Sequence, residues 1–212
     1  MQPSTAGIVV VGTRMTASTN STAADTLVFP QKIKLRDGTR VLIRPLQAED
    51  RDDLIHGFSK LSIGSRRYRF LSPIRKLTEK QLESLLDVDQ LNHVAIGVKD
   101  IGRIGKPGIA IGRFVRLHDE PSVAEFAITV IDEYQNRGLG SLLTRILMEA
   151  AREHGIRVLR GYLLDDNASM IRILKRFGAG LKREWGNVLK TDLTVAVSAD
   201  SIASEPRSAE PR

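Results

Sequence analysis

The sequence predicts an α/β (α+β) fold with one mixed, mostly antiparallel central sheet and helices on both of its faces. Three observations support this: several short apolar runs are joined by hairpin signals, two segments carry a helical apolar stripe, and one strand–helix–strand unit spans residues 122–164. Hairpins join antiparallel strands, whereas a crossover through a helix joins parallel ones. The chain has 212 residues, of which 42% are hydrophobic and 27% charged, enough for one domain with a sizeable core.

The first half predicts two hairpins and two helices. Residues 33–45 read as two short strands around Asp37-Gly38, a hairpin signal. A helix is expected from about residue 48 to 61. Thr78 precedes Glu79-Lys80-Gln81 in a capping-box pattern, which predicts a second helix through about Leu86. Residues 93–98 and 109–117 alternate as strands, joined by a loop rich in glycine and charge.

The second half predicts alternating strands and helices. A strand over residues 122–131 leads through a glycine-containing loop into a helix that ends at Gly155. The apolar stripe of this helix is formed by Leu139, Leu142, Leu143, Ile146, Leu147, Ala150 and Ala151. A strand over residues 158–164 follows, then a helix capped by Asp166 or Asn167, and a closing hairpin of residues 181–185 and 188–197.

Composition divides the chain into three parts and argues against disulfides, metal sites and membrane-spanning segments. Residues 1–28 are rich in Ser, Thr, Ala and Gly, and residues 198–212 are similar, so both segments are expected to be disordered around a folded domain of residues 29–197. The chain has no cysteine, which rules out disulfides and thiolate metal sites and fits a cytoplasmic location. No apolar run approaches the length of about 18 residues that a membrane span needs. The four histidines show no metal spacing, so no metal is expected.

The charge balance favours an anionic ligand. The net charge is +7, which suits phosphate groups, and nucleic acid is the rival interpretation. Aromatic residues make up only 5% of the chain and no basic helix or zinc-finger spacing is present, so no nucleic-acid partner is expected.

The most informative motif is the loop from Gln135 to Gly140, with the sequence Gln-Asn-Arg-Gly-Leu-Gly. Glycines let the main chain approach an anion closely, and the helix that follows offers unpaired N–H groups and the positive end of its dipole. The loop therefore predicts a backbone cradle for phosphate. A plain tight turn is the alternative for the glycines taken alone.

Three parts of the sequence line up with a known family. The strand Ala124–Val130 carries one acid, the loop matches the pattern Q/R-x-x-G-x-G/A, and the segment Asp166–Met170 opens the second helix. Over about residues 40–196 this resembles the GNAT superfamily of acyl-CoA-dependent N-acetyltransferases. The first half, with Ile43-Arg44-Pro45-Leu46 and the run Ser65–Phe70, is similar to the acetyltransferase domain of bacterial protein lysine acetyltransferases. Relatives of that group carry an attached nucleotide-sensing or acyl-CoA-ligase domain, for which the length of this chain leaves no room.

The resemblance implies a GNAT-like sheet, acetyl-CoA as co-substrate and an amine as acceptor. The pyrophosphate would lie on the loop amides, with Arg137 as added charge, and the pantetheine arm would pair with the preceding strand. Asn167 would reach the thioester region, and Met170 would pack nearby. The implied donor-binding residues are Ile128, Thr129, Val130, Gln135, Asn136, Arg137, Gly138, Leu139, Gly140, Ser141, Asn167 and Met170.

Simpler roles remain open for several of these residues. Arg137 is interpreted first as a solvated loop charge, and Asn167 has an alternative as a helix N-cap. The basic run Arg66–Arg69 is interpreted first as a solvated helix end, because charge runs usually face solvent. Its alternative role is a wall of the acceptor site or a contact to a CoA phosphate.

Glu125 is the expected general base. A lysine amine has a pKa near 10.4, so at neutral pH roughly one in a thousand or fewer is neutral. Glu125 interrupts an apolar run, and partial desolvation there would raise the pKa of its carboxyl. Strand alternation places it with Val123, Ala127 and Thr129, and if that face is solvated Glu125 is only an exposed strand acid. The tyrosine that many GNAT enzymes use as the acid is replaced by Leu174.

The sequence therefore predicts an acyltransferase that moves acetyl from acetyl-CoA directly to a primary amine. A protein lysine is the favoured acceptor, and a small-molecule amine is the second choice if the acceptor cleft is narrow and acidic. A non-catalytic acyl-CoA-binding regulatory module is the alternative from another class. The sequence leaves four questions open: the identity of the acceptor, the preferred acyl chain, whether the protein is a monomer or a homodimer, and whether Met15 is the true start.

Overall fold

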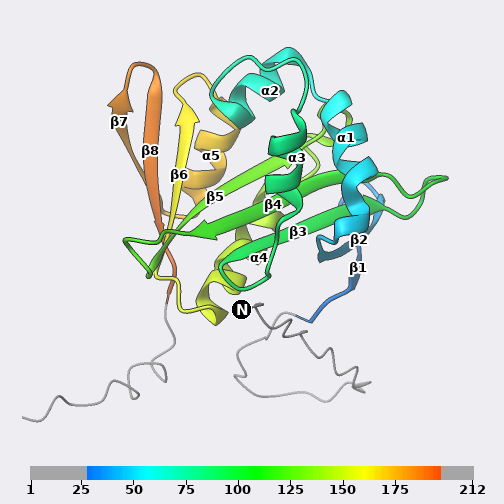
Figure 1. The fold of residues 1–212 in the computed structure, drawn as a ribbon, viewed down its shortest axis with the longest axis horizontal. Coiled ribbons are helices and arrows are strands. Elements are labelled where there is room, and N and C mark those ends of the chain that lie inside the picture. The colour runs from blue at the N-terminus through cyan, green and yellow to red at the C-terminus, as the bar shows by residue number, and fades with distance from the viewer. Residues whose placement is uncertain (1–27, 197–212) are drawn as a thin grey trace, which may run out of the picture.

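The computed structural model describes residues 28–196, which build a single eight-stranded sheet (Figure 1). The strand order is β1-β2-β3-β4-β5-β6-β8-β7. Every neighbouring pair is antiparallel except β5 and β6, so the expected mixed, mostly antiparallel sheet is confirmed. The strands are β1 Gln31–Lys34, β2 Arg40–Pro45, β3 His93–Asp100, β4 Gly108–Arg116, β5 Val123–Val130, β6 Val158–Leu164, β7 Gly180–Trp185 and β8 Val188–Thr194.

Helices cover both faces of the sheet, as expected. The helices α1 (Arg51–Ser59), α2 (Ile63–Phe70) and α3 (Glu79–Leu86) form a front layer in the view of Figure 1, and α4 (Leu139–Glu153) and α5 (Ala168–Arg176) form a rear layer. Two short 3₁₀ helices, η1 (Ala48–Asp50) and η2 (Asp132–Tyr134), precede α1 and the glycine loop. No helix in the range 28–196 combines the length and apolarity that a membrane crossing requires. The segments predicted to be disordered, residues 1–28 and 198–212, lie outside the described residues except for Val28.

The rear layer holds the main apolar core. Helix α4 buries seven residues against the sheet, namely Leu139, Leu143, Thr144, Ile146, Leu147, Ala150 and Ala151. Gly112 of β4 allows this close approach, because a Cβ there would lie 3.2 Å from Leu147 Cδ1. Burying a leucine side chain fully contributes about 1.5–3 kcal/mol, so this stripe fixes α4 firmly on β4 and β5.

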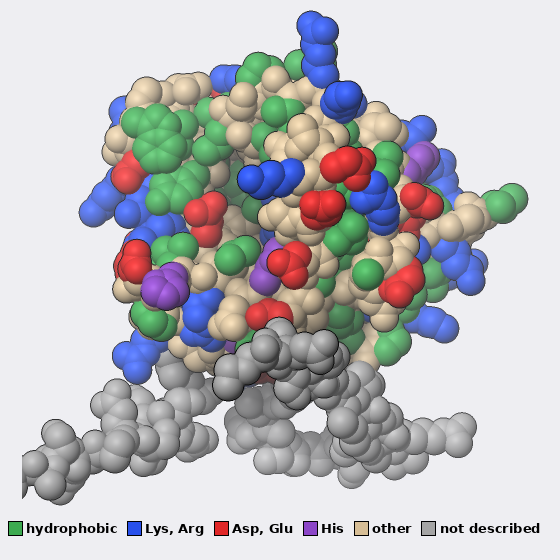
Figure 2. All heavy atoms as spheres, in the orientation of Figure 1, with side chains coloured by type: hydrophobic (Ala, Val, Ile, Leu, Met, Phe, Trp, Pro, Cys, Tyr) green, Lys and Arg blue, Asp and Glu red, His purple; other side chains and the backbone are tan. Residues whose placement is uncertain are grey.

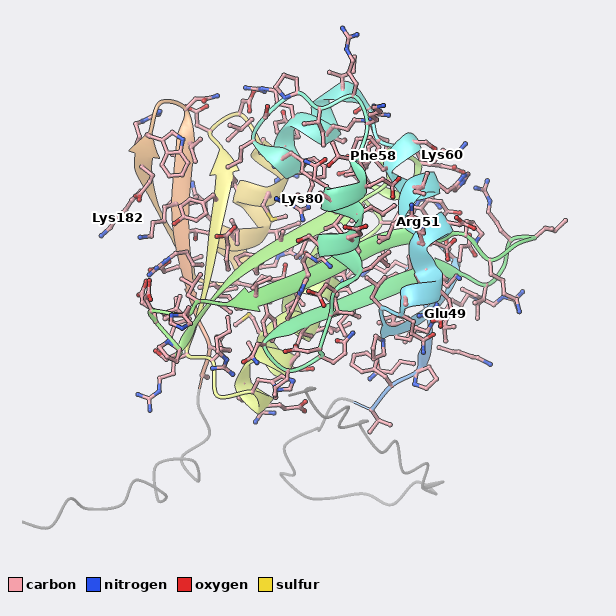
Figure 3. All side chains as sticks on the ribbon, viewed as in Figure 1. Glu49, Arg51, Phe58, Lys60, Lys80 and Lys182 are labelled. Carbon is pink, nitrogen blue, oxygen red and sulfur yellow. The ribbon has the colours of Figure 1, made fainter. Side chains whose placement is uncertain are left out.

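The front layer is more polar and less buried. Neither α1 nor α2 has a fully buried residue, and Glu49, Lys60 and Lys80 are exposed on its outer side (Figure 3). Helix α2 was not predicted, since its sequence lacks an apolar stripe; the hydroxyl of Ser62, which accepts from the Ser65 N–H at 3.2 Å, begins it instead. The predicted capping box at the start of α3, between Thr78 and Gln81, is confirmed.

Strands β5 and β6 pair over only three residues before they separate. The pairs are Val123 with Val158, Ala124 with Leu159, and Glu125 with Arg160. Beyond this point the two strands diverge, as Figure 1 shows. Gly161 lies at the fork, where an added Cβ would be 2.7 Å from the Phe126 ring. The parallel crossover through α4 was predicted, and the divergence of its two strands opens the groove described next.

Candidate functional site

A groove of about 390 Å³ lies between the diverging ends of β5 and β6. Helix α2 lines it from the front layer, and the first turn of α4 and most of α5 line it from the rear layer. All of the residues that the sequence analysis expected to hold the donor contribute to its wall, except Arg137. The structure therefore brings together residues that are spread over 43 positions of the chain, from Ile128 to Met170.

The glycine loop has the backbone shape of an anion cradle. Asn136 and Gly138 both adopt left-handed conformations, with φ of 60° and 91°. Left-handed residues that alternate with ordinary ones turn successive N–H groups toward the same side. Helix α4 begins directly afterwards at Leu139, and the first N–H groups of a helix have no acceptor within it. The loop and helix start together can bind a phosphate through the main chain.

The side chains of Gln135 and Arg137 hold this loop in place. Gln135 Nε2 lies 3.2 Å from the carbonyl oxygen of Val130 and 3.1 Å from the hydroxyl of Ser65. Arg137 pairs with Asp37 at 2.9 Å, and its guanidinium lies 4.7 Å from the centre of the Tyr134 ring. The side chain of Arg137 is 34% exposed, so it is a partly solvated loop charge, and its head group also ties the loop to the β1–β2 hairpin.

Asn167 is the N-cap of α5. Its Oδ1 accepts a hydrogen bond from the Met170 N–H at 3.2 Å, which confirms the capping interpretation. Asn167 and Met170 also face the groove. Leu174, which the resemblance places at the position of the expected tyrosine, is 1% exposed and forms part of the groove wall.

Helix α2 is linked to the start of α5 beside the groove. Arg67 pairs with the Asp166 carboxylate at 2.7 Å, and the Tyr68 hydroxyl donates to the Asp166 carbonyl at 3.3 Å. Arg66 donates to the carbonyl oxygens of Leu61 and Arg75. The basic run is thus half-buried and bonded, and its interpretation as a solvated helix end is wrong.

Glu125 belongs to the last residue pair before β5 and β6 separate, one residue before Phe126, and it does not itself line the groove. Its side chain is exposed, and its nearest strand neighbours are Val115 of β4 and Arg160 of β6. The partial desolvation expected from the sequence is absent, because the front helices do not cover this part of β5. The second interpretation, in which Glu125 is an acid on an exposed strand face, describes its position in the fold.

Arg113, under the front layer, was not predicted as a site residue, whereas Arg69 beside it belongs to the basic run named in the sequence analysis. Arg113 of β4 is 7% exposed and donates to the Leu85 carbonyl, while its Nε is buried without a partner in residues 28–196. Arg69 of α2 adjoins it. Burial and the neighbouring Arg69 charge lower the pKa of Arg113 to about 9. The sequence offered one signal for this residue, because Arg113 is a cation placed between Gly112 and Phe114 within a mostly apolar strand.

Comparisons with known proteins agree with this geometry. The family model of the acetyltransferase (GNAT) domain matches residues 40–180. Acetyltransferase Pat of Mycolicibacterium smegmatis is 34% identical over 179 residues, which are 84% of this chain and 53% of that protein. Acetyltransferase PA5475 of Pseudomonas aeruginosa is 35% identical over 137 residues, 64% of this chain and 71% of that protein.

A solved structure shares the fold over most of its length. The GNAT domain of Streptomyces lividans PAT superposes with a TM-score of 0.71 and 28% identity, covering 78% of this chain and 96% of that one. The chain spans about half the length of the M. smegmatis relative.

Proposed function

The chain belongs to the GNAT acetyltransferase family, and we propose that it transfers an acetyl group from acetyl-CoA to a lysine side chain of a protein. The observation that carries the donor assignment is the separation of β5 and β6 next to the left-handed loop at the start of α4. A CoA pyrophosphate would bind the main-chain N–H groups of residues 137–141. The extended pantetheine arm would then run between the strands and pair with residues 128–130 of β5.

The transfer needs one proton acceptor and one proton donor. The amine nitrogen attacks the thioester carbonyl, so that an N–C bond forms and the C–S bond breaks. Glu125 takes the amine proton, directly or through a water molecule. A backbone N–H of β5 stabilises the oxyanion. The CoA thiolate takes its proton from water, because Leu174 offers none.

An open surface in front of the sheet supports a protein acceptor. Helices α1 and α3 lie over the half of the sheet nearer β2, α2 lies beside the ends of β5 and β6, and no helix of the described residues covers β7 and β8 (Figure 1). Figure 2 shows hydrophobic side chains gathered over β7 and β8 on this face. Tyr162 and Trp185 stack there with ring centres 5.4 Å apart, and Trp185 is 54% exposed. A lysine projecting from a folded protein can reach Glu125 across such a surface, whereas a small amine would find few walls.

Two assays test the proposal. Titration calorimetry with acetyl-CoA tests the donor groove, and release of free CoA thiol with a lysine-bearing protein tests the transfer. We expect both to be positive. Binding without turnover on any amine would favour a regulatory acyl-CoA-binding module, and turnover on small amines alone would replace the protein acceptor. Absence of binding would refute the whole assignment.

The role of Glu125 has its own test. Replacing a general base lowers kcat by about 10²–10⁴-fold, so Glu125→Gln should lose most activity between pH 6 and 9. Glu83→Gln, which changes an exposed acid on α3, is the matched control and should keep wild-type activity. If Glu125→Gln transfers acetyl as fast as the wild type over this pH range, another group is the base.

A further inference from the structure

A second cavity, of about 90 Å³, lies between the front helices and the sheet. Its walls are mainly apolar, from Leu54, Phe58, Leu61, Ile111, Ala127 and Ile131. Four cations, Arg44, Arg69, Lys99 and Arg113, interrupt this apolar lining, together with the carboxylates of Asp50 and Asp53. Within residues 28–196 neither Arg69 nor Arg113 has a carboxylate within 4 Å, although ion pairs are formed elsewhere in the fold.

Arg113 is the more deeply buried of the two. Its Nη2 donates to the carbonyl oxygen of Leu85 near the end of α3, and its Nε is buried with no partner in the described part of the chain. Arginine carries five N–H donors, so one backbone acceptor satisfies only part of the head group. A buried cation without a counter-charge is costly to keep, which points to an anion that the fold itself does not supply.

The charged neighbours of this pair do not neutralise it. Burial lowers the pKa of Arg69, and Glu125 is the carboxylate whose charge acts on it, although the two form no ion pair. His93 faces Arg113 from β3, and burial together with the Arg113 charge lowers the pKa of its imidazole, which is therefore neutral at pH 7. At the far end of the cavity, Arg44 is paired with Asp50, and Lys99 with Asp53.

The cavity opens toward the transfer point. It shares Leu61, Arg69, Ala127 and Thr129 with the donor groove, and Arg69 lies where the two meet. A pantetheine arm that runs along β5 from residue 130 toward residue 126 brings the thioester carbonyl close to Ala127. A group attached to that carbonyl, or to the attacking amine, can therefore enter the cavity.

We propose that Arg69 and Arg113 form a carboxylate-binding site that extends the donor groove and selects substrates with a carboxylate a few bonds from the reacting carbonyl. This inference rests on the proposed acyl transfer. The carboxylate belongs to the acyl chain of a dicarboxylic acyl-CoA or to the amine acceptor. Arginine suits either, because its planar fork binds a carboxylate through two parallel hydrogen bonds.

The first arm of the test varies the acyl chain. With a lysine peptide as acceptor, kcat/KM is measured for acetyl-, butyryl- and succinyl-CoA in the wild type, Arg69→Gln and Arg113→Gln. Arg145→Gln, an exposed cation on α4, is the matched control. The second arm keeps acetyl-CoA and compares free lysine with its carboxamide.

We expect the carboxylate-bearing partner to be preferred at least tenfold in one of the two arms. Each charge-assisted hydrogen bond lost should reduce this ratio about tenfold to hundredfold in Arg69→Gln and Arg113→Gln, while Arg145→Gln keeps it. Arg113→Lys should restore only part of the ratio, because lysine cannot bind in a bidentate manner. The preference ratio compares two substrates of the same variant, so a general loss of activity does not change it. If Arg113→Gln fails to fold, Arg69→Gln still gives the result.

Two outcomes overturn the inference. One is the absence of a carboxylate preference in both arms, and the other is a preference that both glutamine variants retain, which would leave Arg113 only a role in holding α3. Calorimetry with CoA distinguishes failure of the proposed arginine site from failure of the proposed function. Wild-type protein that binds CoA and transfers acetyl without carboxylate preference refutes the arginine site alone, whereas failure to bind CoA refutes the donor groove.

Discussion

The two faces of the sheet are built in different ways. Behind it, α4 buries a continuous apolar stripe, and the glycine of β4 at residue 112 lets this helix lie close to the sheet. In front of it, α1 and α2 have no fully buried residue, and cations and carboxylates lie between them and the strands. The rear packing fixes the groove for the donor. The front layer leaves a mainly apolar cavity that contains charged side chains, and an open surface where we propose that the other substrate binds.

The largest expected effect compares one leucine from each face. Leu147 of α4 is 0% exposed, whereas Leu54 of α1 is half-buried and borders the front cavity. Leu147→Ala should lower the free energy of unfolding by about 3 kcal/mol, within the range for buried leucines. Leu54→Ala should cost about 1 kcal/mol, because it loses less buried surface. Urea unfolding of both variants checks this, and equal losses would abolish the distinction between the faces.

The next effect concerns charge in the front layer. Burial alone would raise the pKa of the Asp50 carboxyl, but hydrogen bonds from Arg44 and the Gln47 N–H, together with the Lys99 charge, hold it below its usual range. Asp50→Asn should cost about 2 kcal/mol at pH 7, as hydrogen bonds between charged groups are lost.

The same contact should make stability depend on pH. A lowered carboxyl pKa contributes stability that is complete above the unfolded value of about 3.9 and is lost as the pH falls through the lower folded value. The difference in unfolding free energy between wild type and Asp50→Asn should therefore be constant from pH 7 to about 5 and shrink below about pH 4. A difference that stays constant down to pH 2 would contradict the assigned pKa direction.

A smaller effect is expected at the fork between β5 and β6. Gly161→Ala would place a Cβ 2.7 Å from the Phe126 ring and 3.2 Å from Thr191 Cγ2, which should cost about 1–2 kcal/mol by overpacking. Because Phe126 lines the donor groove, acyl-CoA affinity should fall as well. Gly180→Ala is the control, since a Cβ added at residue 180 would have open space around it, with no contact within 4 Å. If thermal unfolding and calorimetry give the same stability and the same acyl-CoA affinity for both variants, Gly161 is not needed to shape the groove.

The smallest expected effect is that of the link between α2 and α5. Arg67 and Asp166 are 37% and 50% exposed, so their coupling should be about 0.2–1 kcal/mol and should weaken at high salt. A double-mutant cycle with Arg67→Ala and Asp166→Ala in urea unfolding measures it. A coupling above about 2 kcal/mol would show that the front layer is held to α5 as firmly as α4 is held to the sheet.

The sequence predicted the rear face better than the front for a physical reason. Helix α4, its glycine loop and the Asn167 cap depend on residues within a few positions of one another, so periodicity and capping patterns indicate them directly. Helix α2 has no apolar stripe, and no helix was therefore predicted to span residues 63–70. The roles that side chains acquire only in the folded protein were also missed.

Two residues illustrate such contacts. The head group of Arg137 is held by Asp37, 100 positions earlier in the chain, and no local pattern connects them. Arg113 meets Arg69 only because α2 folds over β4 and β5, and their shared cavity has no sequence signature. The exposure of Glu125 likewise depends on where the front helices end, which the alternation of strand residues cannot indicate.

The most direct test of the central claim is a crystal structure of the protein with acetyl-CoA. We expect the pyrophosphate on the main-chain N–H groups of residues 137–141, the pantetheine arm between β5 and β6, and the thioester carbonyl near Ala127. Acetyl-CoA bound elsewhere, with the groove between β5 and β6 free of it, would refute the proposed donor site.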